Sequence, residues 1–131
     1  MLLPESQVIK FIDVKEWHAG DYIWDVGTIL HNLLVAAPVE REGDGSASLE
    51  GSQLTYTFTI PEVYQRVATD VLDRIKDFAT SLGDLTWNRR LELSIASNLL
   101  GLPEGRLRRG MTTSALICFG EGVRRLSDFA S

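Results

Sequence analysis

Helical periodicity is the feature that most constrains the fold of this 131-residue chain. Over residues 61–82, apolar side chains recur every three or four positions, a spacing that places them on one face of an α-helix. Pro61 suits the first helical position, with Thr59 or its neighbour as a cap, and Gly83 suits the end. Such a long amphipathic helix needs other elements to cover its apolar face. Its apolar positions are Val63, Tyr64, Val67, Val71, Leu72, Ile75, Phe78, Ala79 and Leu82.

Two further stripes predict helices on the C-terminal side. Thr86 can cap the first of these, which ends at Gly101 and Pro103, and Thr112 or Thr113 can cap the second. The short connections favour antiparallel neighbours, so residues 61–131 are predicted to form a three-helix region. The apolar positions are Trp87, Leu91, Ile95, Leu99 and Leu100 in one helix, and Leu116, Ile117, Phe119, Val123, Leu126 and Phe129 in the other.

The middle of the chain predicts one helix and one extended segment. Val26, Ile29 and Leu30 begin a helical stripe over residues 22–37, and Pro38 is expected to end it. Residues 38–60 are expected to form a loop and an extended segment. Glycine, serine and acidic residues over 40–52 indicate a mobile loop, and the alternating apolar residues over 53–60 indicate a half-buried strand.

The first 20 residues predict a short β-hairpin. Residues 8–12 are β-branched and aromatic, and a turn at 4–7 separates them from the apolar residues 1–3. The predicted fold class is therefore α+β and mostly helical. It comprises a short N-terminal hairpin followed by about four helices, within a single domain spanning residues 1–131.

Composition limits the class of function. Thirteen basic and eighteen acidic residues give a net charge of −5, which does not favour binding to nucleic acid or to an anionic membrane. No apolar run approaches the ~20 residues of a membrane-spanning helix, and the N-terminus lacks a basic signal region. We therefore expect a cytoplasmic protein. The single cysteine, Cys118, lies in an apolar run and is expected to be a buried thiol rather than a nucleophile.

An aspartate ends the apolar strand of the predicted N-terminal hairpin. Asp13 follows residues 8–12, and a carboxylate at such a point either caps a turn or serves as a metal ligand. Gly20-Asp21 and Trp24-Asp25 follow within a few residues. This run resembles the aminoglycoside phosphotransferase and choline kinase-like family, in which a strand ends in Ile-Asp, Gly-Asp comes next, and a helix opens with an aspartate.

The resemblance implies specific roles for two acids. Asp13 stands where the family has its second metal-binding aspartate, and Asp25 stands where a buried acid braces the catalytic loop. Val14, Lys15 and Tyr22 depart from the family pattern, and Lys15 would reduce the negative charge near Asp13. The fold that the resemblance implies is the C-terminal part of the C-lobe of a protein kinase-like phosphotransferase.

The resemblance also implies cofactors and a substrate class. An intact relative would use Mg²⁺ and ATP to phosphorylate a hydroxyl group of a small molecule. The catalytic aspartate would precede Met1, so we expect this chain alone to be inactive and to bind neither cofactor tightly. In aminoglycoside-modifying relatives, acids on the C-terminal helices help to bind a cationic substrate. By the resemblance, the acids of the predicted long helix could have this role, or they could simply form a solvated helix face. These acids are Glu62, Asp70, Asp73 and Asp77.

Other interpretations of the sequence stay open. The chain can instead be a non-catalytic interaction domain, whose exposed apolar surface would make it a homo-oligomer, or an unrelated helical domain. Arg106, Arg108 and Arg109 form a predicted basic loop that either meets a phosphate or carboxylate or is simply solvated. His18 and His31 are expected to be packing or surface residues rather than ligands.

Overall fold

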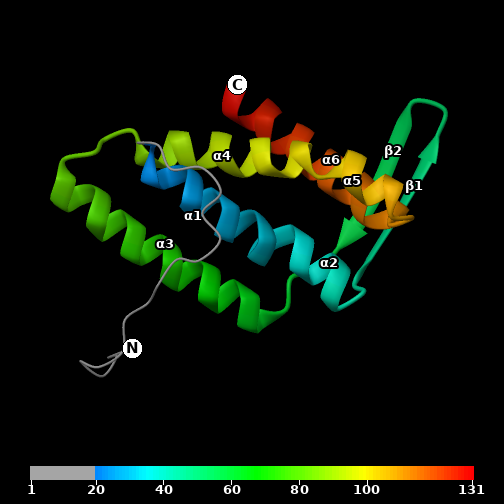
Figure 1. Cartoon of the computed structure of the whole chain (residues 1–131), viewed down its shortest axis with the longest axis horizontal. Helices are drawn as coiled ribbons and strands as arrows, with labels where there is room; N and C mark the ends of the chain where they lie inside the picture. The colour runs from blue at the N-terminus through cyan, green and yellow to red at the C-terminus, as the bar shows by residue number, and fades with distance from the viewer. Residues whose placement is uncertain (1–19) are drawn as a thin grey trace.

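The computed structural model of the chain describes residues 20–131 (Figure 1). The predicted N-terminal hairpin and its metal-ligand turn, with the exception of Gly20, lie outside these residues. The described part is α+β and mostly helical, as predicted. Its elements are α1 (Tyr22–His31), the π-helical segment η1 (Asn32–Ala36), α2 (Ala37–Arg41), β1 (Gly45–Glu50), β2 (Gln53–Phe58), α3 (Glu62–Leu82), α4 (Trp87–Gly101), α5 (Pro103–Arg108) and α6 (Thr112–Ala130).

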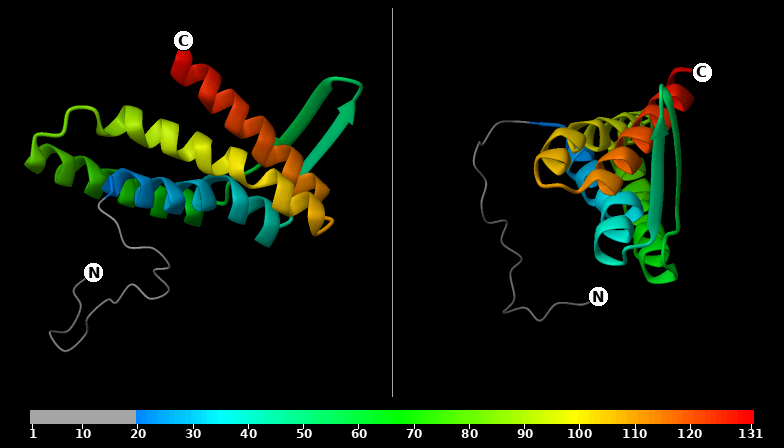
Figure 2. Two further views of the ribbon diagram at one scale, coloured as in Figure 1. Left: turned by 45° about the horizontal axis from the view of Figure 1, so that its top comes forward. Right: turned by 90° about the vertical axis from the view of Figure 1, so that its right-hand side faces the viewer.

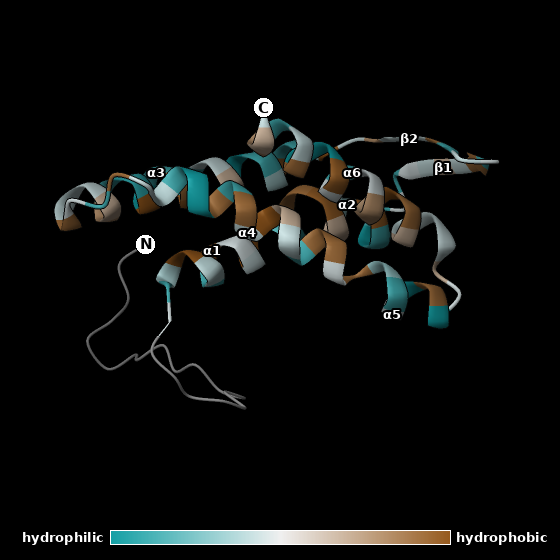
Figure 3. Cartoon of the chain, turned by 90° about the horizontal axis from the view of Figure 1, so that it is seen from above, coloured by the Kyte–Doolittle hydropathy of each residue, from teal (hydrophilic) through white to brown (hydrophobic). Residues whose placement is uncertain are grey.

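The core forms where α4 packs between α1 and α6 (Figures 1 and 2). Figure 3 shows hydrophobic residues concentrated along α4 and the neighbouring helices. α3 lies along the other side of α1 and η1, where the ring of Tyr22 meets that of Phe78 edge-on at 5.2 Å. Fully buried side chains from three helices fill the centre, and they include Ile23, Leu30, Ile95, Leu99 and Ile117.

A glycine allows α1 and α4 to approach closely. A Cβ atom added to Gly27 would lie 1.9 Å from Ser94 Oγ and 2.6 Å from Ser94 Cβ. Ser94 itself is fully buried, and its hydroxyl donates to the Trp24 carbonyl at 3.5 Å. The absence of a side chain at Gly27 therefore sets the distance between the two helices.

Pro38 does not end the first helix, contrary to the prediction. The helical path continues through η1 and α2 to Arg41. Proline inside an α-helix lacks an N–H donor, and its ring collides with the carbonyl four residues earlier. In η1 the Ala37 N–H donates to the Asn32 carbonyl, five residues back. This wider turn accommodates Pro38, which is fully buried, without breaking the helix.

The predicted loop over residues 40–52 is also wrong in part. Its first residues belong to α2, and residues 45–50 form β1, which pairs antiparallel with the correctly predicted strand β2. Gly51, with φ 60°, provides the tight turn between them. The missed strand contains two serines and one glycine and carries few apolar residues. Its pairing comes from β2 and from the packing of both strands on α6.

Two of the predicted helix boundaries hold, and other details change. Gly83 ends α3 in the left-handed conformation with φ 69°, and α4 ends at Gly101. Pro103 then begins the short helix α5, so the predicted basic loop is helical up to Arg108. Thr59 does not cap α3, because its hydroxyl donates to Asp44. None of the helices within residues 20–131 is long and apolar enough to cross a membrane.

Candidate functional site

The start of α1 carries the residues that most closely follow the family pattern. Asp21 is the N-cap of α1, and its carboxylate accepts a hydrogen bond from the Ile23 N–H at 3.0 Å. Trp24 and Asp25 follow in the first turn of the helix, and both are exposed. Asp13 and His18 lie outside the described residues, so the predicted metal ligand stays a prediction.

An ion-pair cluster anchors this end of α1 to the α3–α4 connection. Arg90 on α4 donates to Asp21 at 2.6 Å and to Asp84 at 2.7 Å, and the Tyr22 hydroxyl donates to Asp84 at 2.7 Å. The hydrogen bonds from Arg90 hold the pKa of Asp84 well below its usual range and lower the pKa of Asp21 as well. Both carboxylates are therefore ionised at neutral pH and already have a cationic partner.

Removing Arg90 should destabilise the fold in a pH-dependent manner. We expect Arg90→Met to lower the urea midpoint of unfolding at pH 7, because Asp21 and Asp84 then keep their charges without a partner. The pKa values of Asp21 and Asp84 are lower in the folded protein than in the unfolded chain. The two acids therefore stabilise the fold fully above the unfolded pKa of ~3.9, and this stabilisation is lost as the pH falls through their folded pKa values. The difference in urea midpoint between the wild type and Arg90→Met should therefore become smaller below about pH 4.

The matched control for Arg90→Met is Arg74→Met. Arg74 pairs with Asp70 at 3.0 Å, but both side chains are about two-thirds exposed. An exposed pair of this kind contributes little to stability, so its removal should leave the urea midpoint nearly unchanged at every pH. Equal effects of the two substitutions would contradict the importance assigned to the Arg90 cluster.

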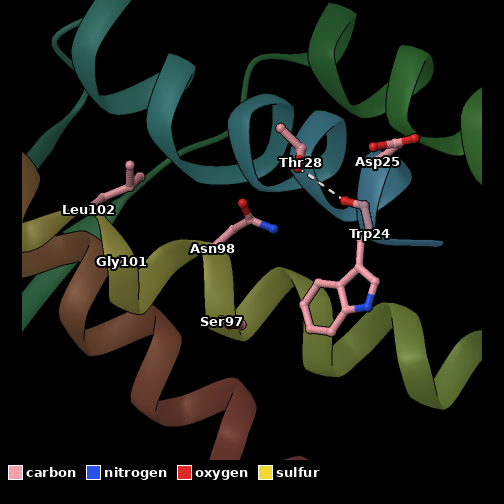
Figure 4. A pocket seen from close by; sticks show the side chains of 7 residues that line it. All are labelled: Trp24, Asp25, Thr28, Ser97, Asn98, Gly101 and Leu102. Atoms are coloured by element: carbon pink, nitrogen blue, oxygen red, sulfur yellow. Dashed lines mark hydrogen bonds between the residues drawn. The ribbon is translucent and has the colours of Figure 1, made fainter. Parts of the chain in front are cut away.

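A shallow pocket lies beside the exposed residues of α1 (Figure 4). Its volume is about 360 Å³, and α1 and α4 form its walls. In Figure 4 the indole of Trp24 reaches toward α4, and the Thr28 hydroxyl donates to the Trp24 carbonyl. The Asn98 amide donates to the Ser94 carbonyl at 2.8 Å. The lining residues are Trp24, Asp25, Thr28, Ser97, Asn98, Gly101 and Leu102.

Asp25 differs from the buried acid that the resemblance implied. Its side chain is exposed, and no hydrogen bond joins its carboxylate to another residue of the part described, 20–131. The resemblance pairs Asp25 with a catalytic loop, and the contacts of the described residues do not test that pairing. The bracing role of Asp25 therefore stays a prediction.

The described residues do not form a metal site by themselves. Within residues 20–131, no three histidine, cysteine, aspartate or glutamate side chains come together in a group that could hold a metal ion. Asp21 and Asp84 do lie close together, but Arg90 occupies the space between their carboxylates. These two acids do not fit a magnesium ion, because magnesium needs oxygen ligands and bound water around it and the Arg90 cation fills that space.

Arg106, one of the arginines of the predicted basic loop, is used within the fold. It donates to Glu40 at 2.6 Å, and the Ser114 hydroxyl donates to the same oxygen at 2.8 Å. Burial opposes ionisation of Glu40, but the hydrogen bonds from Arg106 and Ser114 lower its pKa overall. Nearby, burial lowers the pKa of His31 and raises that of Cys118, so both are neutral packing residues, as predicted.

A buried acid was missed by the sequence analysis. Glu121 on α6 accepts hydrogen bonds from the Tyr56 hydroxyl at 2.8 Å and from Arg124 at 2.9 and 3.0 Å. Arg125 lies 3.5 Å from the same carboxylate. Burial and the bond to Glu121 raise the pKa of Tyr56 to about 12. The signal in the sequence was an acid three and four residues before two arginines, a spacing that makes them neighbours on a helix surface.

The predicted acidic edge of α3 is exposed but partly neutralised. Glu62 lies 3.9 Å from Arg66, and Asp70 lies 3.0 Å from Arg74, each pair one helical turn apart. Asp73 is also exposed. The paired arginines reduce the negative charge that a cationic substrate would meet. The contacts of these acids are those of a solvated helix face.

Comparisons with protein-family models, with curated proteins and with solved structures gave no match.

Proposed function

We propose that this chain is the C-terminal helical part of the C-lobe of an aminoglycoside phosphotransferase-like small-molecule kinase. In this proposal Asp13 contributes to a magnesium site, and α1 supports the catalytic loop of an intact relative. Phosphoryl transfer from ATP to a hydroxyl group needs that loop and a nucleotide-binding lobe as well. The chain alone is therefore expected to be inactive.

One observation carries this proposal. Helix α1 begins directly after Gly20-Asp21, and it presents Trp24 and Asp25 on a surface that the other described residues leave open. The Arg90 cluster holds this end of the helix in position without using Asp25. An exposed indole beside an exposed carboxylate on a firmly held helix end is consistent with a surface that supports another segment.

Manganese binding followed by NMR tests the proposal. We expect Mn²⁺ to bind at millimolar affinity, because most of the ligands of an intact site are lacking, and to broaden the amide signals around Asp13. Asp13→Asn should abolish this broadening. Asp73→Asn, which removes an exposed acid elsewhere, should leave it unchanged. If wild type and Asp13→Asn respond alike at saturating metal, Asp13 is not a metal ligand and the proposal fails.

As a second candidate, we propose a non-catalytic domain that associates with itself. The observation that favours it is the number of large apolar side chains exposed on the described helices. They include Val63, Val67, Phe78 and Leu82 on α3, and Phe119, Val123 and Leu126 on α6. Exposed apolar patches of this kind drive association. Sedimentation of the wild-type chain tests this candidate independently of any metal binding.

A further inference from the structure

One side of α1 is exposed although it carries two large apolar side chains. Trp24 and Ile29 are 43% and 50% exposed. Because each residue of an α-helix turns the chain by about 100°, these two side chains leave the helix about 140° apart. Asp25 and Thr28 lie between them, and both are exposed. The α1 strip, as we name it, consists of these four residues.

The α1 strip has an acidic centre between two apolar edges. In Figure 4 the indole of Trp24 reaches toward α4, and the carboxylate of Asp25 leaves the helix on another side. Among residues 20–131, no cation pairs with Asp25, whereas Asp21, one turn earlier, is bound by Arg90. A segment that fits this strip should therefore offer two apolar side chains with a cation between them.

The chain carries such a pattern just before α1. Residues 8–12 read Val-Ile-Lys-Phe-Ile. In an extended backbone every second side chain points to the same side, so Val8, Lys10 and Ile12 form a row in which a cation lies between two apolar residues. The order of chemical types in this row is the complement of that in the α1 strip.

The row and the strip also agree in length. Helix geometry places the Cα atoms of Trp24 and Ile29 about 9 Å apart, and the tips of their diverging side chains lie further apart than that. The two apolar ends of the row are about 13 Å apart in an extended backbone. When the ends of the row contact Trp24 and Ile29, the central Lys10 falls opposite Asp25.

Covalent linkage makes a small contact sufficient. Residues 13–20 connect the row to Asp21, and eight residues can span up to about 26 Å. The strip extends only about 12 Å along the helix from Asp21. A segment on so short a linker meets the strip at an effective concentration of about a millimolar. A separate molecule would instead need a standard interface of roughly 800 Å² on each partner.

We infer that residues 8–12 bind along the α1 strip, with Lys10 facing Asp25. Val8 and Ile12 then cover the two apolar edges, and Asp25 gains a cationic partner. The inference goes beyond both proposed functions, because it requires neither a metal ion nor a second copy of the chain.

Cleavage by a lysine-specific protease tests the inference. The chain has lysine at positions 10, 15 and 76. A protease must grip residues on both sides of the bond it cuts, so binding of residues 8–12 to α1 should slow cleavage after Lys15. Lys76 lies inside α3, and cleavage after it reports unfolding of the whole protein.

A charge exchange tests the pairing of Lys10 with Asp25. Asp25→Arg and Lys10→Glu each place like charges opposite one another, so each should speed cleavage after Lys15 about tenfold. Combining the two substitutions restores opposite charges and should return the rate to within about twofold of wild type. Asp73→Arg, which makes the same change of charge at an exposed position on α3, should have no effect.

Each outcome supports or overturns the inference. Faster cleavage in both single variants, with recovery in the double variant and slow cleavage after Lys76 throughout, supports it. Equal rates in wild type and all variants show that the segment is not held on the strip. Failure of the double variant to recover, or an equal effect of Asp73→Arg, overturns the pairing of Lys10 with Asp25. None of these results depends on manganese binding or on sedimentation.

Discussion

Substituting Gly27 by alanine should lower the free energy of unfolding by about 2–3 kcal/mol and the melting temperature by roughly 10 °C. The added methyl group would lie 2.6 Å from Ser94 Cβ, a contact that rotation of the serine hydroxyl cannot relieve. Helices α1 and α4 must therefore move apart and lose packing around Leu30 and Leu99, both fully buried. Urea titration followed by circular dichroism measures the loss.

The chain offers a control and a rescue for this prediction. Gly101 is also helical, but a methyl group there would meet no atom within 4 Å. Gly101→Ala should therefore stabilise the protein by up to about 1 kcal/mol through helix propensity alone. Adding Ser94→Gly to Gly27→Ala removes the colliding side chain and should restore part of the lost stability. If Gly27→Ala and Gly101→Ala behave alike, the close approach of the helices is not as described.

Replacing Glu121 by glutamine should cost about 2–3 kcal/mol of stability, because Arg124 and Arg125 then lose the buried carboxylate that they share. Glutamine keeps the shape of the side chain and can still accept the bond from Tyr56, so the effect reports mainly on charge. Burial opposes ionisation of Glu121, but the bonds from Arg124 and Tyr56 lower its pKa overall. Chemical unfolding at pH 7 gives the measurement.

The pH dependence of the Glu121→Gln effect has a definite sign. The folded pKa of Glu121 lies below the unfolded value of ~4.3, so its stabilising contribution is complete above that value. It disappears as the pH falls through the folded pKa, and the wild-type and variant curves should converge in acid. Asp128→Asn, which removes an exposed partner of Arg124, should cost less than about 0.5 kcal/mol. An equal cost at both positions would contradict the role given to Glu121.

The sequence was most informative where apolar spacing alone determines structure. The stripe over α3 and the glycine after it follow directly from helix geometry, and both agree with the structure. β1 was missed because it contributes few apolar residues of its own, so only the partner strand and α6 reveal it. The prediction that Pro38 ends the helix was wrong, because the rule that proline breaks an α-helix assumes bonds four residues back. The sequence gives no sign of the bond five residues back that makes room for this proline.

The polar clusters depended on contacts that lie far apart in the chain. Arg90 bonds to Asp21, which is 69 residues away, and Tyr56 bonds to Glu121, which is 65 residues away. Periodicity indicates which face of a helix is buried, but it does not indicate which neighbouring element will meet a polar residue there. The resemblance to the kinase-like family pointed to residues at the start of α1. The ion pairs that hold this end of the helix are visible only in the structure.

The π-helical segment η1 also corrects the angular phase of the buried residues. In an uninterrupted α-helix, Val35 and Val39 would point roughly 120° and 160° around the axis from Ile23. A turn that holds one extra residue rotates the following residues back by about 100°. Val39, which follows η1, thus returns to within about 60° of Ile23. Val35 lies inside η1 and is turned back only part of the way, and both valines are buried. Deleting one residue from this segment would restore regular α-helical bonds, but it would turn Val39 away from the core.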